Sequence, residues 1–96
     1  MVKHIVMFDF KPENREENLL KAKKMLESLL ETVPSLKSME VGLNFSKEER
    51  AMDLSIITSF DNKDGLELYA NHPEHLKVVS FIKTVVSQSK VSDYIV

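Results

Sequence analysis

The sequence predicts an α+β domain of the ferredoxin-like type, with a four-stranded antiparallel sheet that carries its helices on one face. Four segments alternate apolar and polar residues with a period of two, and two longer regions repeat apolar residues every three or four positions. Their order is strand, helix, strand, strand, helix, strand. Right-handed crossovers then place both helical regions on the same face, with the first and third strands in the centre.

The composition fits one globular domain over residues 1–96, with 43% apolar and 29% charged residues. The net charge of −2 gives no general attraction to nucleic acid or acidic membranes, so neither is an expected partner. Lys3 and His4 interrupt the N-terminus before a signal peptide could form, and no apolar run approaches the roughly 20 residues of a membrane span. We therefore expect a cytoplasmic protein. The absence of cysteine excludes disulfides and thiolate metal sites.

The first strand is expected at residues 2–10, where one side is almost wholly apolar and the other is mixed. A helix should follow, with Asn14 and Glu17 forming a capping box at its start. Pro34 should end this helix, because the residue before a proline is pushed out of helical geometry. The apolar stripe of this helix consists of Leu19, Ala22, Met25, Leu26, Leu29, Leu30 and Val33.

Two more strands are expected at residues 38–45 and 52–60, and the short charged loop between them favours an antiparallel hairpin. Pro73 then divides a helical region, because a proline clashes inside a helix but is favoured in its first turn. We expect a short helix ending near Asn71, a longer one starting at Pro73, and a final strand at residues 90–96. The apolar stripe of the longer helix consists of Leu76, Val79, Ile82, Val85 and Val86.

The face of the sheet without helices is too apolar to lie against water and too polar for a domain core. A second copy packing sheet to sheet would bury it, so we expect a homodimer that forms a dimeric α+β barrel. The apolar residues predicted on this face are Ile5, Met7 and Ile57, among the polar residues Lys3, Asp9, Asp53, Ser55 and Ser59.

The seven residues from Tyr69 to His75 hold two of the three histidines and one of the two tyrosines. If the short helix folds against the longer one, Tyr69 and His75 both point at the sheet, beside His4. A neutral imidazole suits general acid–base chemistry, and a phenol can donate to a developing enolate. The candidate catalytic residues are therefore His75, Tyr69 and His4. A pocket between sheet and helices would be lined by His4, Val6, Phe8, Leu26, Tyr69, His75 and Val79.

Each histidine also has a structural interpretation. His75 could bond a backbone group or Tyr69 to fix the kink, and His4 could be a core residue with its hydrogen bonds satisfied. His72 is expected to cap the helix that Pro73 begins. No carboxylate or third histidine is placed to complete a site with His72 and His75, so no metal site is predicted.

Three motifs resemble the stress-responsive A/B barrel domain family: Lys3-His4-Ile5-Val6-Met7-Phe8, Val33-Pro34, and Tyr69-x-x-His72-Pro73-x-His75. The resemblance covers essentially the whole chain, and the last motif is its most specific part. It implies a dimeric α+β barrel in which two ferredoxin-like sheets pack face to face. Most bacterial proteins of this family have no known activity.

The resemblance extends to a plant polyketide cyclase of the family that closes its product by aldol condensation without a cofactor. It matches the catalytic histidine to His75, the catalytic tyrosine to Tyr69 and a pocket histidine to His4. The wall that shapes its substrate is not retained, so that substrate is not carried over. A further pocket histidine falls on Leu54, and bulky aromatic residues fall on Ala22 and Leu26.

Three functions are open at this point, and whether the protein is an enzyme is not decided. The first is binding of a small hydrophobic molecule in the pocket. The second is a cofactor-free cyclase or lyase acting on a carbonyl or polyketide-like substrate, with His75 as base and Tyr69 as acid. The third is a stress-associated oligomeric scaffold. A pocket of roughly 300 Å³ or more that reaches His75 would favour the first two.

Overall fold

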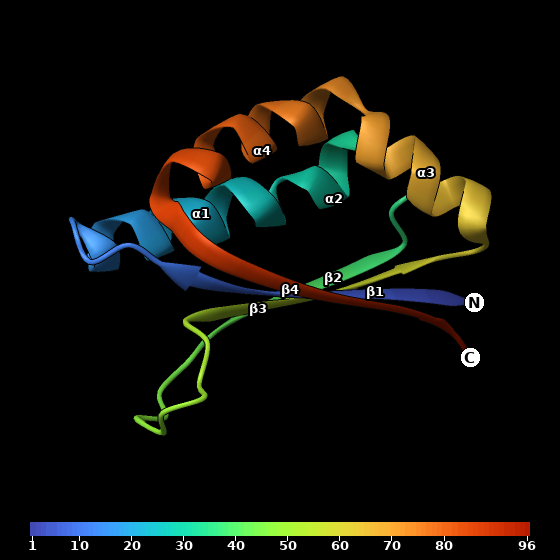
Figure 1. Ribbon diagram of the computed structural model, residues 1–96. Helices are drawn as coiled ribbons and strands as arrows, with labels where there is room; N and C mark the ends of the chain where they lie inside the picture. The colour runs from blue at the N-terminus through green and yellow to red at the C-terminus, as the bar shows by residue number, and fades with distance from the viewer.

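The computed structural model describes all 96 residues, and its four strands form one sheet in the order β2-β3-β1-β4. All neighbouring strands are antiparallel. Figure 1 shows the helices together on one side of this sheet. The ferredoxin-like fold with β1 and β3 in the centre is confirmed. The elements are β1 (Val2–Phe10), α1 (Arg15–Glu27), α2 (Leu29–Thr32), β2 (Ser38–Leu43), β3 (Leu54–Phe60), α3 (Lys63–Asn71), α4 (Pro73–Val85) and β4 (Val86–Ile95).

The core lies between the helices and the inner side of the sheet. Even-numbered residues of β1 and β3 face this layer, as the alternation predicts, and each large apolar side chain buried here stabilises the fold by about 1.5–3 kcal/mol. None of the helices is both long and apolar enough to cross a membrane. The core residues with almost no exposed surface are Phe10, Ala22, Leu29, Val33, Leu54 and Phe60.

The start and the end of the first helical region differ from the prediction. Asn14 adopts left-handed backbone geometry (φ 53°, ψ 33°) and its side chain forms no capping bond, so the predicted capping box is wrong. Asparagine tolerates this geometry better than most residues. The helix is also interrupted at Ser28, whose hydroxyl donates to the Met25 carbonyl at 2.6 Å and competes with the regular helical pattern. The chain turns there and continues as α2.

Two strand predictions also need correction. The hairpin strands are shorter than predicted, because β2 ends at Leu43 and β3 begins at Leu54, so that Phe45 projects from the loop with 95% of its surface exposed. The final strand begins at Val86, directly after α4, and not at residue 90. Its first residues lack an apolar pattern, but pairing along the whole of β1 holds them in the sheet, with Val86 opposite Phe10.

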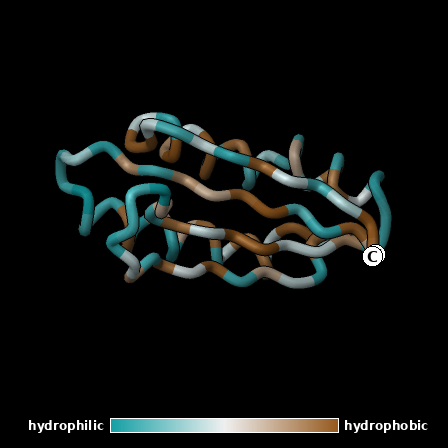
Figure 2. Tube along the Cα trace, turned by 60° about the horizontal axis from the view of Figure 1, so that its bottom comes forward, coloured by the Kyte–Doolittle hydropathy of each residue, from teal (hydrophilic) through white to brown (hydrophobic).

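We call the side of the sheet without helices the open face. The register places Ile5 beside Ile57 at its centre. Met7 and Ile57 each have 38% of their surface exposed there, and Tyr94 of β4 has 43%. Figure 2, turned so that this side comes forward, shows apolar stretches within the strands between polar ones. The predicted mixed character of this face is therefore present in the structure.

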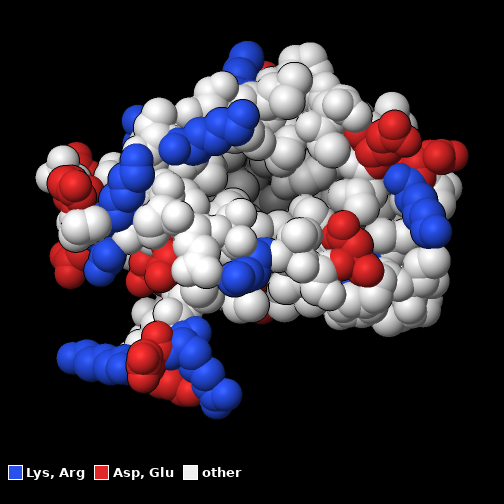
Figure 3. Space-filling model, in the orientation of Figure 1, with Lys and Arg blue, Asp and Glu red and all other residues white.

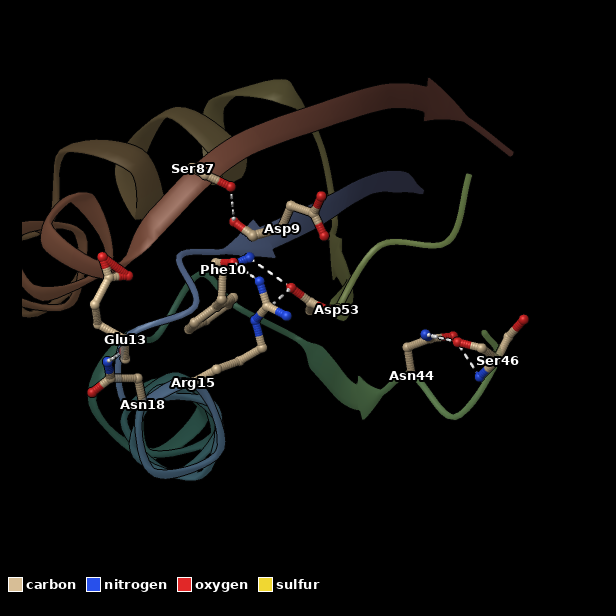
Figure 4. A network of polar contacts seen from close by, with 9 residues as sticks. All are labelled: Asp9, Phe10, Glu13, Arg15, Asn18, Asn44, Ser46, Asp53 and Ser87. Atoms are coloured by element: carbon tan, nitrogen blue, oxygen red, sulfur yellow. Dashed lines mark hydrogen bonds and ion pairs between the residues drawn. The ribbon is translucent and has the colours of Figure 1, made fainter. Parts of the chain in front are cut away.

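One end of the open face carries the neighbouring carboxyl groups of Asp9 and Asp53, with Arg15 from α1 beside them (Figure 4). The Asp53 carboxylate has both a hydrogen-bond donor and a counter-charge: it accepts the Phe10 amide at 2.7 Å and lies 3.7 Å from the Arg15 guanidinium. Partial burial, a hydrogen bond shared with Asp53 and the Asp53 charge raise the pKa of Asp9, against the opposing effect of Arg15.

We expect Asp9→Asn to increase stability at pH 7. A raised pKa means that the folded state favours protonated Asp9, so the ionised form costs stability once the pH rises above the ordinary value of 3.8. Asparagine removes that charge and still donates to Asp53. The gain should shrink as the pH falls toward 3.8, measured by urea unfolding across this range. Asp53→Ala is the matched control, expected to lose about 1 kcal/mol or more because it orphans the Phe10 amide. Loss of stability in Asp9→Asn at pH 7 would contradict the prediction.

Candidate functional site

The break between α3 and α4 positions the reactive side chains. Asn62 caps α3 by accepting the Gly65 amide at 2.9 Å, and α3 ends at Asn71. His72 has extended backbone geometry, as expected before a proline, and its Nδ1 accepts the Glu74 amide at 3.1 Å. The prediction that His72 caps a helix beginning at Pro73 is confirmed. A proline at this position costs no hydrogen bond, since the first amides of a helix have no partner within it.

His75 is held across this break by a hydrogen bond to the last turn of α3. Its Nδ1 lies 3.1 Å from the carbonyl oxygen of Ala70. A carbonyl only accepts, so Nδ1 carries the hydrogen, and Nε2 of the neutral ring is free to accept a proton. Burial lowers the pKa of His75, and the charges of His4 and His72 lower it further, against the opposing effect of the Ala70 bond. The neutral base form is therefore favoured at pH 7.

Tyr69 lies between the other rings of the site and has only 3% of its surface exposed. Its ring centroid is 4.3 Å from that of His75, 5.2 Å from that of Phe60 and 6.4 Å from that of His4. Burial raises the pKa of Tyr69 to about 12. The side chain is therefore a neutral phenol at physiological pH, and it can donate a hydrogen bond or a proton.

His4 reaches the same site from β1. Its Nδ1 is bonded to a carboxylate oxygen of Asp93 on β4, which fixes the ring and leaves Nε2 as the second nitrogen. The backbone carbonyl of His4 accepts the hydroxyl of buried Thr58 at 2.9 Å. The structure thus brings His4 of β1 together with Tyr69 of α3 and His75 of α4, which lie more than 60 residues later in the sequence.

These three residues form one end of a cavity of about 470 Å³ that lies under α4, which we call the α4 cavity. Figure 3 shows a hollow in the middle of the corresponding face of the molecule, with Lys or Arg side chains near it. Apolar side chains from α1, α4, β1 and β3 make most of its wall. The cavity is lined by His4, Val6, Phe8, Leu26, Ile56, Tyr69, His75, Val78, Val79, Ile82, Lys83, Val86, Ser87, Gln88 and Ser89.

The fold is shared with proteins already described. The model of the stress-responsive A/B barrel domain matches residues 2–96. The chain belongs to the stress-responsive A/B barrel domain family. An Arabidopsis thaliana protein of the family, the stress-response A/B barrel domain-containing protein At5g22580, is 26% identical over 95 residues, which cover 96% of this chain and 83% of that protein.

Solved structures of similar fold include proteins with and without a known activity. A dimeric protein of unknown function with a ferredoxin-like fold from Bacteroides fragilis is 28% identical, with a TM-score of 0.88 over 97% of this chain and 93% of that chain. A hydroxynitrile lyase from Passiflora edulis is 18% identical, with a TM-score of 0.88 over 99% and 92% of the two chains. At that identity the likeness to the lyase shows the fold alone.

In this A/B barrel domain, all seven residues expected around a pocket lie on the wall of the α4 cavity. Sequence reasoning missed its other end, formed by Lys83 and the start of β4. Lys83 stands four residues after Val79 and eight after His75, a spacing that places all three on one face of a helix. That signal was present, but a charged residue near a helix end is more often solvated. Ser87 and Ser89 were missed because the final strand was expected to begin after them.

Proposed function

We propose that this protein binds a small hydrophobic molecule in the α4 cavity. The observation that carries the proposal is a cavity of about 470 Å³ with a mostly apolar wall and a few polar groups at its two ends. Cavities of 300–1,000 Å³ with this character are typical of small-molecule sites. A purely structural scaffold would gain stability by filling this space, since unfilled core volume is costly. The open cavity therefore favours binding over the scaffold interpretation.

We also infer that the binding unit is a homodimer joined through the open face. The apolar side chains of Ile5, Met7, Ile57 and Tyr94 would lie between two sheets packed face to face. The Bacteroides fragilis relative, at 28% identity, is dimeric. Because this interface uses the side of the sheet away from the helices, it leaves the α4 cavity accessible in each subunit. A cytoplasmic location stays a prediction.

A second candidate function is cofactor-free acid–base catalysis on a carbonyl compound. The contact of the Tyr69 and His75 rings, at 4.3 Å between centroids, favours it. In this mechanism Nε2 of His75 takes a proton from the carbon next to a carbonyl group, or from a hydroxyl group. The Tyr69 phenol donates to the oxygen on which negative charge develops. In a cyclase these two steps form the enolate that closes the ring. In the cleavage of a cyanohydrin, His75 would take the hydroxyl proton, the carbon–carbon bond would break as the carbonyl group forms, and the leaving cyanide would take a proton from Tyr69. The Passiflora edulis lyase shows that this fold can support an enzyme.

Val79→Phe tests binding, because the added ring would fill part of the α4 cavity. We expect the affinity for 1-octanol, followed by NMR chemical-shift titration, to fall at least about tenfold. Leu76→Phe is the control, since Leu76 lies on the same helix with 50% of its surface exposed and does not line the cavity. Failure of the wild type to bind 1-octanol, or equal loss in both variants, would count against the cavity as the binding site.

Ile57→Asp tests the dimer. An unpaired carboxylate at the centre of the open face would be buried on association, at a cost of several kcal/mol. We expect a dimeric wild type and a monomeric variant in sedimentation velocity, both folded by circular dichroism. Leu68→Asp on α3, where 65% of the side chain is exposed, should remain dimeric. A monomeric wild type, or an Ile57→Asp variant that stays dimeric, would refute the interface.

His75→Asn tests catalysis, because its amide can still donate to the Ala70 carbonyl but offers no base at the position of Nε2. For the wild type we expect exchange of the α-protons of 2-octanone in D₂O, detected by NMR, and a decline as the pH falls and His75 becomes protonated. The variant should be slower by about 10²–10⁴. Cleavage of mandelonitrile tests the lyase reaction separately. Full exchange activity in His75→Asn would exclude His75 as the base.

A further inference from the structure

The wall of the α4 cavity carries a positively charged side chain and no negatively charged one. No aspartate or glutamate lines it, and Lys83 is the one lysine or arginine on its wall. The other ionisable groups on the wall are the two histidines and Tyr69, none of which is an anion near pH 7. A cationic ligand would meet an ammonium group and no counter-charge within the cavity, whereas an anionic ligand would meet an attractive one.

Lys83 is free to serve a ligand. Its ammonium group takes part in none of the ion pairs or side-chain hydrogen bonds of the chain, unlike Lys77 on the same helix, which pairs with Glu74 at 2.7 Å. Lys23 likewise pairs with Glu27, and Lys11 donates to the Thr84 carbonyl. The one lysine on the cavity wall is therefore without a partner, whereas Lys77 and Lys23 each pair with a carboxylate.

The acid–base residues and the ammonium group stand at opposite ends of the cavity. His75 lies in the first turn of α4 and Lys83 in its last turn. Their separation of eight positions corresponds to about 12 Å along the helix axis. The wall between the two ends is apolar, with Val79 and Ile82 from α4 and Leu26 from α1. A ligand that spans the cavity thus needs an apolar middle of roughly this length.

We propose that the α4 cavity selects an apolar carboxylate, with the carboxylate at Lys83 and the apolar body running toward Tyr69 and His75. This inference rests on the proposed binding function and adds the class of ligand. A carboxylate fits better than a phosphate group, because one ammonium balances its single charge. The wall has no arginine and no second lysine with which a doubly charged group could pair.

Three probes of similar length and different charge test the selection: octanoate, 1-octanol and octylamine, titrated by NMR into the full-length protein at pH 7. We expect octanoate to bind most tightly, about fivefold more tightly than 1-octanol, which is the upper range for a solvent-exposed ion pair. Octylamine should bind most weakly. Raising the salt concentration should weaken octanoate binding and leave 1-octanol binding unchanged.

Lys83→Gln should bring the ratio of octanoate affinity to 1-octanol affinity down to about one, and Lys83→Glu should reverse the preference toward octylamine. Lys77→Gln is the control, because it removes the same charge from the same helix outside the cavity. The proposal is overturned if octanoate and 1-octanol bind equally to the wild type. It is also overturned if the preference survives Lys83→Gln or is lost equally in Lys77→Gln.

The same titrations separate this inference from the proposed function on which it rests. Binding of 1-octanol without any preference for octanoate would leave the apolar site intact and refute only the role of Lys83. Failure of all three probes to bind would refute both.

Discussion

The rigid break at His72–Pro73 is the constraint on which the site depends. On a continuous helix, Tyr69 and His75 would point about 120° apart around the axis, because six residues at 100° each complete 600°. Pro73 forbids that helix, since it lacks an amide hydrogen and restricts the backbone of the residue before it. The chain extends at His72 and restarts, and the Tyr69 and His75 rings come to 4.3 Å from each other.

Two hydrogen bonds hold this break in one geometry. Nδ1 of His72 accepts the Glu74 amide at the start of α4, and Nδ1 of His75 donates to the Ala70 carbonyl at the end of α3. The two histidines use the same ring atom in opposite roles, so they need different tautomers when neutral. This explains why a motif with two histidines around one proline can be structural at His72 and still present a free Nε2 at His75.

Most of the fold could be predicted because local pattern and tertiary packing agree. The alternation of apolar and polar residues in β1 predicts a strand, and Pro34 and Pro73 predict helix boundaries, without a reasonable alternative. The errors occur where a long-range contact overrides the local signal. Residues 86–89 have no strand pattern, yet β1 offers a whole edge for pairing, and β4 therefore starts four residues earlier than expected. The left-handed turn at Asn14 and the interruption at Ser28 depend on backbone geometry that composition does not encode.

The candidate site was predictable at one end for the same reason. Tyr69, His75 and His4 form a recognisable set of acid–base side chains. Nothing in the sequence around Lys83 indicates a ligand, and only the structure shows that it lies on the cavity wall. The structural and chemical roles of His75 are compatible, because the first uses Nδ1 and the second needs Nε2. What distinguishes a binder from an enzyme is thus where the ligand places its atoms. A ligand anchored at Lys83, about 12 Å along α4, presents its far end to the Tyr69–His75 pair, so the anchor decides which bond lies within reach of the base.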